Sequence, residues 1–193
     1  MSLLSNNKFI KKGNKMKKTI LSLALLSSLS LHAGGFYAGV DSEAGSGKHE
    51  ITRDGVAIAQ SDSVSTSSFG LHVGYVLSPE GSVELSYGAL GIDDDDVTRI
   101  GVDYIRTFPM GSSIKPYAGI GLSTNSMSDE NIETGLGGRL RLGAYYEIIP
   151  SLDLGAEVNF NYISWETETD ALGHEFELSS TYYGLGLNLN YRF

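Results

Sequence analysis

From Gly34 to its last residue the chain alternates apolar residues with small or polar ones, over eight successive segments. The last segment shows the pattern most fully. Its odd positions from Tyr183 to Phe193 are leucine or aromatic, and the positions between them are glycine, asparagine or arginine. Successive side chains of a β-strand point to opposite faces, so a period of two predicts strands with one apolar face. Because no segment keeps a helical period, we expect an all-β protein.

The seven segments upstream repeat this pattern, and the connections between them also alternate in length. The apolar positions span Phe36–Val40, Phe69–Leu77, Val83–Ala89, Ile100–Tyr104, Ala118–Leu122, Leu140–Ile148 and Leu154–Tyr162. The short connections are Ser78–Gly81, Phe108–Ser113 and Ile149–Ser151, and the longer ones are Gly45–Ser63, Gly91–Asp96, Thr124–Thr134 and Trp165–Glu177. This pattern predicts an eight-stranded antiparallel up-and-down transmembrane β-barrel with periplasmic termini and four outer loops.

The alternation does not by itself say which face lies inside the barrel. A soluble barrel such as a lipocalin fills its interior with the apolar residues and turns the polar ones to water. An eight-stranded barrel, however, has an interior just wide enough for side chains. Here the polar face is rich in glycine, whereas the apolar face is bulky, with tyrosine and phenylalanine near strand ends. Because aromatic residues gather at the two interfaces of membrane barrels, we expect the apolar face to lie in lipid.

The predicted lumen face carries charged residues of both signs. A buried charge is tolerated when it is paired and hydrogen-bonded, so these residues are expected to form a closed polar network. The expected pairs join Arg99, Arg139 and Arg141 to Glu84, Asp103 and Glu157. The alternative, which the sequence leaves open, is that some of these charges lie at the wet rim and pair with nothing.

The N-terminal segment has the features of an export signal. A run of 12 mostly apolar residues, Ile20 to Leu31, follows Lys17 and Lys18 and ends near Ala33. This pattern predicts a cleavable signal peptide, since a helical membrane span needs about 20 residues. The alternative is that this segment is not cleaved and stays as a membrane anchor. We therefore divide the chain into an extension and signal peptide, 1–33, and a barrel domain, 34–193, with Met16 as a second possible start.

Composition excludes several classes of function. The chain has no cysteine, which excludes a disulfide scaffold and Cys-ligated metal sites. It carries 14 Lys+Arg against 23 Asp+Glu, and this acidic balance argues against non-specific nucleic-acid binding. Removing residues 1–33, which contain six lysines and no acid, leaves a net charge of -15. Many acids fall in the long connections: Asp93 to Asp96, Asp129, Glu130, Glu133, Glu166, Glu168, Asp170 and Glu175.

Three segments resemble a known family. Tyr191-Arg192-Phe193 resembles the C-terminal signal of outer-membrane barrels, in which the barrel-insertion machinery reads the final aromatic residue. Gly35–Val40 and Lys115–Leu122 resemble strand openings of the small OmpA/OmpX/opacity-type, porin-family-like barrels, and the resemblance covers 34–193. It implies a bacterial outer-membrane location, with the bilayer and the insertion machinery as partners. No peptidoglycan-binding domain follows Phe193, so cell-wall anchoring is not expected.

Signs of catalysis or metal binding are weak. His72 lies on the predicted lumen face near Ser68 and Ser86, but catalysis needs nucleophile and base within hydrogen-bond reach, and a structural histidine is favoured. His49 and His174 fall in predicted loops. The Asp93 to Asp96 run offers carboxylates to Ca²⁺ or Mg²⁺ but lacks the EF-hand glycine, which favours a solvated acidic loop. We expect no enzyme activity, no cofactor and no metal site.

These observations favour a structural and surface role in the outer membrane. The barrel would have a closed polar lumen and would present acidic extracellular loops to ligands or cations. Two alternatives stay open: a narrow porin-like pore for small solutes, and a lipid-modifying outer-membrane enzyme. Open aqueous channels belong to barrels of about 16 strands or more, which weighs against a wide pore.

Overall fold

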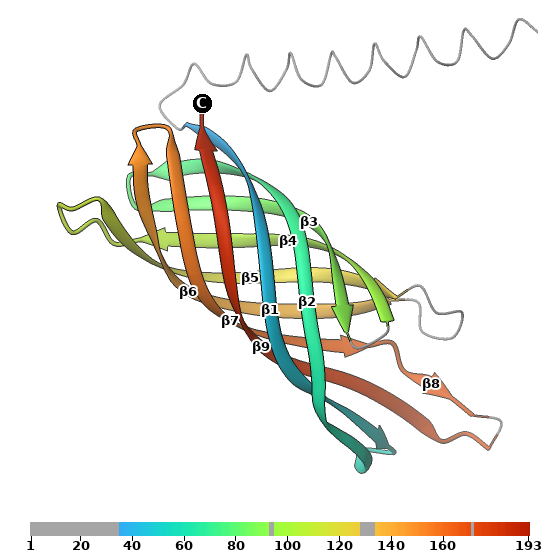
Figure 1. The fold of residues 1–193 in the computed structure, drawn as a ribbon. Helices are drawn as coiled ribbons and strands as arrows, with labels where there is room; N and C mark the ends of the chain where they lie inside the picture. The colour runs from blue at the N-terminus through green and yellow to red at the C-terminus, as the bar shows by residue number, and fades with distance from the viewer. Residues whose placement is uncertain (1–34, 93–94, 128–133, 171) are drawn as a thin grey trace, which may run out of the picture.

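The computed structural model describes residues 35–92, 95–127, 134–170 and 172–193, which form one antiparallel sheet closed on itself (Figure 1). The strands are β1 (Phe36–Arg53), β2 (Val56–Ser78), β3 (Gly81–Ile92), β4 (Asp95–Thr107), β5 (Ile114–Met127), β6 (Thr134–Ile149), β7 (Leu152–Trp165), β8 (Glu168–Thr169) and β9 (Glu175–Arg192). Each pairs with its neighbour in sequence, except that the two-residue β8 lies beside β9, and β9 pairs with β1 to close the barrel. The predicted eight-stranded antiparallel barrel is confirmed.

The predicted extension and signal peptide, residues 1–33, lie outside the described residues. Among the described residues there is no helix long and apolar enough to span a membrane.

Burial follows the alternation, with the polar face inside. Along β7, Asp153, Glu157 and Asn159 are buried, whereas Leu154 and Val158 between them are exposed on the outer surface. This arrangement is the reverse of a soluble barrel and fits a barrel in lipid, where apolar side chains face the hydrocarbon. The assignment of the apolar face to the bilayer is therefore confirmed.

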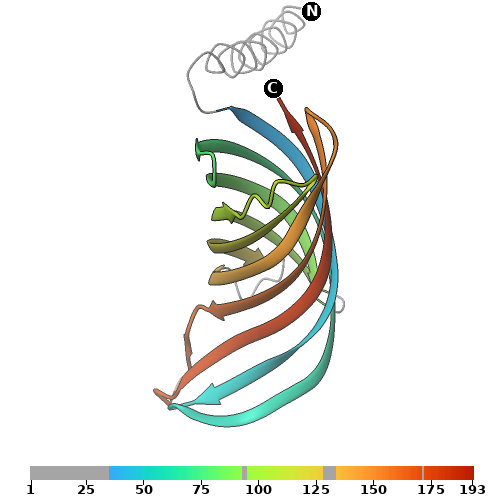
Figure 2. The same cartoon turned by 90° about the vertical axis from the view of Figure 1, so that its left-hand side faces the viewer.

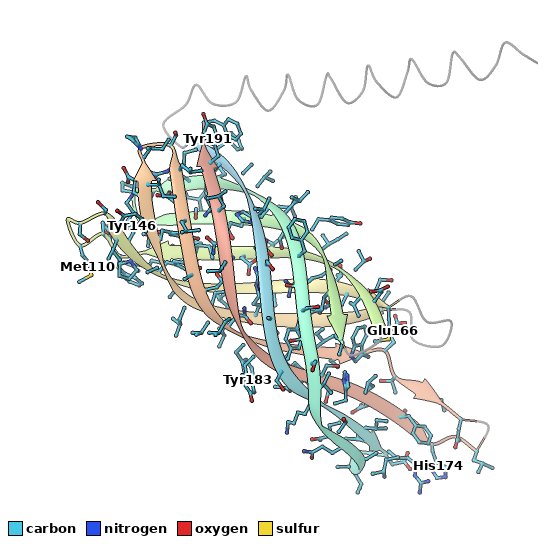
Figure 3. All side chains as sticks on the ribbon, in the orientation of Figure 1. Met110, Tyr146, Glu166, His174, Tyr183 and Tyr191 are labelled. Carbon is cyan, nitrogen blue, oxygen red and sulfur yellow. The ribbon has the colours of Figure 1, made fainter. Side chains whose placement is uncertain are left out.

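Aromatic side chains mark both ends of the lipid-facing band. On β9, Tyr191 stands near the C-terminus and Tyr183 further toward the opposite end (Figure 3). The outward residues from Tyr183 to Tyr191 are all exposed leucine or tyrosine. Tyrosine places its ring in the headgroup region with its hydroxyl toward water, so these two residues bound the lipid-facing part of β9.

The first predicted loop, Gly45–Ser63, is wrong: most of it is strand. β1 continues to Arg53, and β2 begins at Val56. The two strands meet at Asp54 and Gly55, whose φ angles of 50° and 76° suit the tight Asp-Gly turn of a β-hairpin. The prediction failed because a hairpin in water has no lipid-facing side, so its sequence shows no alternation of apolar residues. His49, expected in a loop, therefore lies in β1.

The long hairpin makes one side of the barrel taller than the rest. β9 pairs with β1 as far as Arg53 and Phe176, whereas β2 joins β3 only from Thr66. The three strands β9, β1 and β2 therefore project beyond the others at the end opposite the termini (Figure 2). The other outer connections are shorter than predicted: β3 ends at Ile92, β5 at Met127, and β9 begins at Glu175. The predicted loop residues 93–94 and 128–133 lie outside the described residues.

Candidate functional site

The middle of the lumen is occupied by ionic groups, and Arg141 on β6 is the centre of the first cluster. Its Nε and Nη2 atoms donate to Glu157 Oε2 at 2.9 and 2.8 Å, and its Nη1 donates to Glu84 Oε2 at 2.6 Å. Tyr37 donates its hydroxyl to Glu84 at 2.9 Å, and Tyr117 donates to Glu157. Both carboxylates thus have a guanidinium and a phenol, which is the arrangement that a buried charge requires.

Arg139 is the centre of the second cluster. Its Nε and Nη2 atoms contact the two carboxylate oxygens of Asp103 at 3.2 and 3.0 Å, a bidentate pair. Its Nη1 donates to Glu43 Oε1 at 3.0 Å. Arg99 shares Glu43 at 3.8 Å and donates to the Tyr182 hydroxyl at 3.4 Å. Both clusters are cross-barrel, because β6 contacts Glu84 of β3 in the first cluster and Glu43 of β1 and Asp103 of β4 in the second, none of which is a strand beside β6.

The structure brings together most of the predicted network residues. Arg141 meets Glu84 and Glu157, and Arg139 meets Asp103, whereas Arg99 contacts none of the three predicted acids. Sequence reasoning missed Glu43, which pairs with both Arg99 and Arg139. The available signal was the continuation of the β1 alternation from Tyr37 through Asp41 to Glu43. That continuation was obscured because the outward residues there are Ser42 and Ala44 rather than bulky apolar ones.

His72 lies in the lumen between two polar side chains. Its Nδ1 atom is 3.1 Å from Asp41 Oδ1, and its Nε2 atom is 2.5 Å from Asn190 Oδ1. Both ring nitrogens therefore face side-chain oxygens of β1 and β9, and neither faces Ser68 or Ser86. His72 is 4% exposed, so it has no surface from which to act on a lipid substrate.

An apolar layer lies inside the lumen near the end opposite the termini, which we call the outer end. It consists of inward-facing residues from five strands, with Met127 and Leu178 packed against them: Val64, Leu90, Ile92, Val97, Ile163, Trp165 and Tyr182. The indole of Trp165 donates to Ser180 Oγ at 2.7 Å, which satisfies its polar atom. Sequence reasoning missed this layer, because it placed Trp165 in a loop and assumed a polar lumen face throughout.

A thinner aromatic layer lies toward the end of the barrel where β1 begins and β9 ends. Ile105, Tyr117 and Tyr145 form a buried cluster in which the two tyrosine rings stack at 4.2 Å. Beyond it lies a cavity of about 220 Å³, lined among others by Lys115, Asp153 and Arg192. Three layers thus follow one another along the lumen between the outer end and this cavity: apolar, ionic and aromatic.

At the outer end, a hydrogen-bonded clasp joins the β1–β2 turn to the start of β9. The Asp54 carboxylate accepts a hydrogen bond from the Glu175 backbone N–H at 3.0 Å and lies 2.7 Å from His174 Nδ1. The Glu175 N–H and His174 hold the pKa of Asp54 below its usual value. The backbone N–H groups of His174 and Leu172 similarly lower the pKa of Asp170. The clasp ties together the two tallest parts of the barrel.

The outer end is acidic in the part of the chain that the structure describes. Its exposed acids include Asp54, Asp96, Glu166, Glu175 and Glu177. Within the described ranges, no group of three or more His, Asp or Glu is arranged to hold a metal ion. Asp93 and Asp94 of the predicted cation-binding run lie outside those ranges.

The fold and the filled lumen can be compared with known proteins. The model of the outer membrane protein beta-barrel domain family matches residues 19–193. A search of the curated proteins finds no match.

Solved structures show the same fold. Neisserial surface protein A is 21% identical, with a TM-score of 0.60 over 84% of this chain and 100% of that chain. OprG from Pseudomonas aeruginosa is 15% identical, with a TM-score of 0.52 over 83% and 95%. The N-terminal β-barrel domain of OprF from the same organism is 17% identical, with a TM-score of 0.52 over 80% and 97%. The family model covers nearly the whole chain, and the chain therefore belongs to the outer membrane protein beta-barrel domain family, whose members lie in the bacterial outer membrane.

Proposed function

We propose that this protein is a non-enzymatic structural and surface component of the outer membrane, with a closed lumen and an acidic outer rim. The observation that carries the proposal is the filling of the lumen by three successive layers of side chains. A pore for small solutes needs a continuous water-filled path. The apolar layer around Trp165 offers no polar groups to such a path. The guanidinium groups of Arg139 and Arg141 are paired with lumen carboxylates, so these polar groups bind one another rather than a solute.

The proposed outer partners are cations or basic ligands. The exposed acids at the outer end outnumber the basic residues there, which are Lys48 and Arg53 among the described residues. An acidic surface attracts cationic groups at distances set by ionic strength, about 8 Å at physiological salt. The rim would act by placement and charge rather than by a reaction.

Two terminal elements complete the proposal. Residues 1–33 would direct export and be removed, and the barrel-insertion machinery would read Tyr191 and Phe193. In support, Tyr191 and Phe193 lie in edge-to-face contact at 5.3 Å, and Phe193 donates its backbone N–H to Phe36 at the seam of the barrel. Deleting Phe193 should reduce assembled protein in outer-membrane fractions, while N-terminal sequencing of the mature protein tests cleavage after Ala33.

Conductance separates the closed barrel from the porin-like alternative. The purified protein in planar bilayers should show no resolved unitary steps. Arg139→Ala and Arg141→Ala should then be compared, because each opens space in the ionic layer. Regular steps in the wild type that change in size in these variants would contradict the proposal and favour a narrow pore.

A hydroxyl–imidazole contact gives the enzyme alternative one supporting observation. His49 Nδ1 lies 2.8 Å from Ser180 Oγ, the spacing of a nucleophile and its base. Ser180 is 1% exposed and also accepts the Trp165 indole N–H, which leaves a lipid no access to it. Expression should therefore leave the mass of lipid A unchanged. A mass loss that disappears in Ser180→Ala or His72→Ala would establish a lipid-modifying enzyme instead.

A further inference from the structure

The lipid-facing surface is hollowed near the outer end of β9. The groove has a volume of about 470 Å³ and lies over Gly184, between the side chains of Tyr183 and Leu185. Val158 of β7 bounds it on one side, and Ala44 and Ser46 of β1 line the other. Tyr183 and Leu185 are 64% and 68% exposed, so the groove opens outward to the membrane rather than into the lumen.

The groove exists because β1 presents small residues where its neighbour presents large ones. Ala44 lies opposite Leu185, and Ser46 lies opposite Tyr183. Ser42, Ala44 and Ser46 therefore form a low floor along the outward face of β1 beside a wall on β9. Elsewhere in the lipid-facing band the outward residues are mostly bulky, as in Leu136 to Leu142 on β6 and Leu185 to Tyr191 on β9.

The groove lies in the outer half of the bilayer. On β9 the outward apolar residues end at Tyr183, and the next outward residues toward the outer end are Thr181, Ser179 and Glu177. The strand therefore leaves the hydrocarbon just beyond Tyr183, which faces outward at this level (Figure 3). A molecule in the groove would be a lipid of the outer leaflet.

A basic residue stands where the headgroup of that lipid would lie. Lys48 follows Ser42, Ala44 and Ser46 on the same outward face of β1, at the level of Thr181. It is exposed, and within the described residues no carboxylate forms an ion pair with it. An unpaired ammonium just outside the apolar band is an attractive partner for a lipid phosphate, especially on a rim that is otherwise acidic.

From these two independent features we propose that the groove binds one acyl chain of a phosphorylated lipid of the outer leaflet. The chain would lie between Tyr183 and Leu185, and its phosphate would contact the Lys48 ammonium. The hydroxyl of Ser46 lies between these two regions and can donate to the carbonyl that links chain and headgroup. A second copy of the barrel fits less well, because two convex surfaces would meet on the projecting side chains and leave the recessed floor unfilled.

Retention of lipid by the detergent-purified full barrel tests the proposal. Bisphosphorylated lipid A is added to the delipidated protein, and bound lipid is counted by native mass spectrometry. Ala44→Leu fills the floor, and Ala89→Leu makes the same change on the exposed outward face of β3, a strand that does not line the groove. We expect one retained lipid in the wild type and in Ala89→Leu, and at least a fivefold loss in Ala44→Leu.

A second pair of variants tests the headgroup contact. Lys48→Gln should reduce retention of lipid A severalfold, but should leave retention of its dephosphorylated form unchanged. Arg53→Gln removes the other basic residue of the outer end and should change neither. All variants should keep the faster gel migration of the unboiled, folded barrel. Equal retention by wild type and Ala44→Leu, or a wild-type dimer that Ala44→Leu dissociates, would overturn the proposal.

Discussion

The buried pair of Arg141 and Glu157 offers a quantitative test of the ionic layer. Arg141 has a side chain that is 2% exposed and bonds to Glu157 and Glu84. Arg141→Met removes the guanidinium and leaves two buried carboxylates without a cation, a change that costs about 3–5 kcal/mol. Glu157→Gln keeps the shape and leaves Arg141 paired with Glu84, so its cost should lie near the 1.5–3 kcal/mol typical of a lost charged hydrogen bond.

The double variant shows whether the two residues act on each other. If the direct contacts at 2.8 to 3.1 Å carry the energy, the second substitution costs less once the first is made. We expect a coupling free energy of at least about 1.5 kcal/mol, within the range for residues in one network. It is measured from urea unfolding of the barrel in lipid vesicles, with reversibility established for each variant.

An exposed pair of the same chemistry provides the control. Arg106 and Glu80 lie 3.2 Å apart, and their side chains are 56% and 53% exposed. Water and salt screen such a pair, so its coupling should fall between about 0.2 and 1 kcal/mol. A buried coupling no larger than this control value would refute the reasoning that the lumen pairs hold the ionic layer together.

Two further predictions concern the clasp and the lumen walls. The pKa of Asp54 is lowered in the folded protein, so its contribution to the clasp is present above about pH 3.9 and is lost as the pH falls through the folded pKa. The protection of the Glu175 amide, measured as its hydrogen exchange relative to the intrinsic rate at the same pH, should fall on acidification, and Asp54→Asn should remove that dependence. Gly74→Ala places a methyl group within the ring of Tyr37 and should reduce the folded, heat-modifiable form, whereas Gly138→Ala meets no atom within 4 Å and should leave it unchanged.

The sequence was informative wherever one strand face meets lipid. From Tyr183 to Tyr191, every outward residue of β9 is leucine or tyrosine, and every residue between them is a glycine or asparagine that fits a narrow lumen. This alternation identifies the segment as a strand, the face that meets lipid and the pairing register together. Beyond the membrane, the hairpin of β1 and β2 has water near both of its faces, as at Gln60 and Ser61. Its sequence therefore does not need to alternate apolar and small residues. Its strands were therefore not predictable from hydrophobic period, although the Asp54-Gly55 pair is a recognised hairpin turn.

Which charged side chains pair inside the lumen depends on the stagger of the strands, which the sequence of a single strand does not show. Side chains from opposite walls meet according to the stagger of the strands around the barrel, and that stagger is a property of the closed sheet. Alternation places Arg99 and Glu43 on the lumen side, but only the closed register brings Arg99 to Glu43 instead of to Asp103. Because Glu43 is shared by two arginines and Arg141 is shared by two glutamates, no ion in these clusters is free to hold a passing solute without losing a partner. A lumen built this way stabilises the barrel, and it leaves the outer rim and the lipid face as the surfaces on which the protein can act.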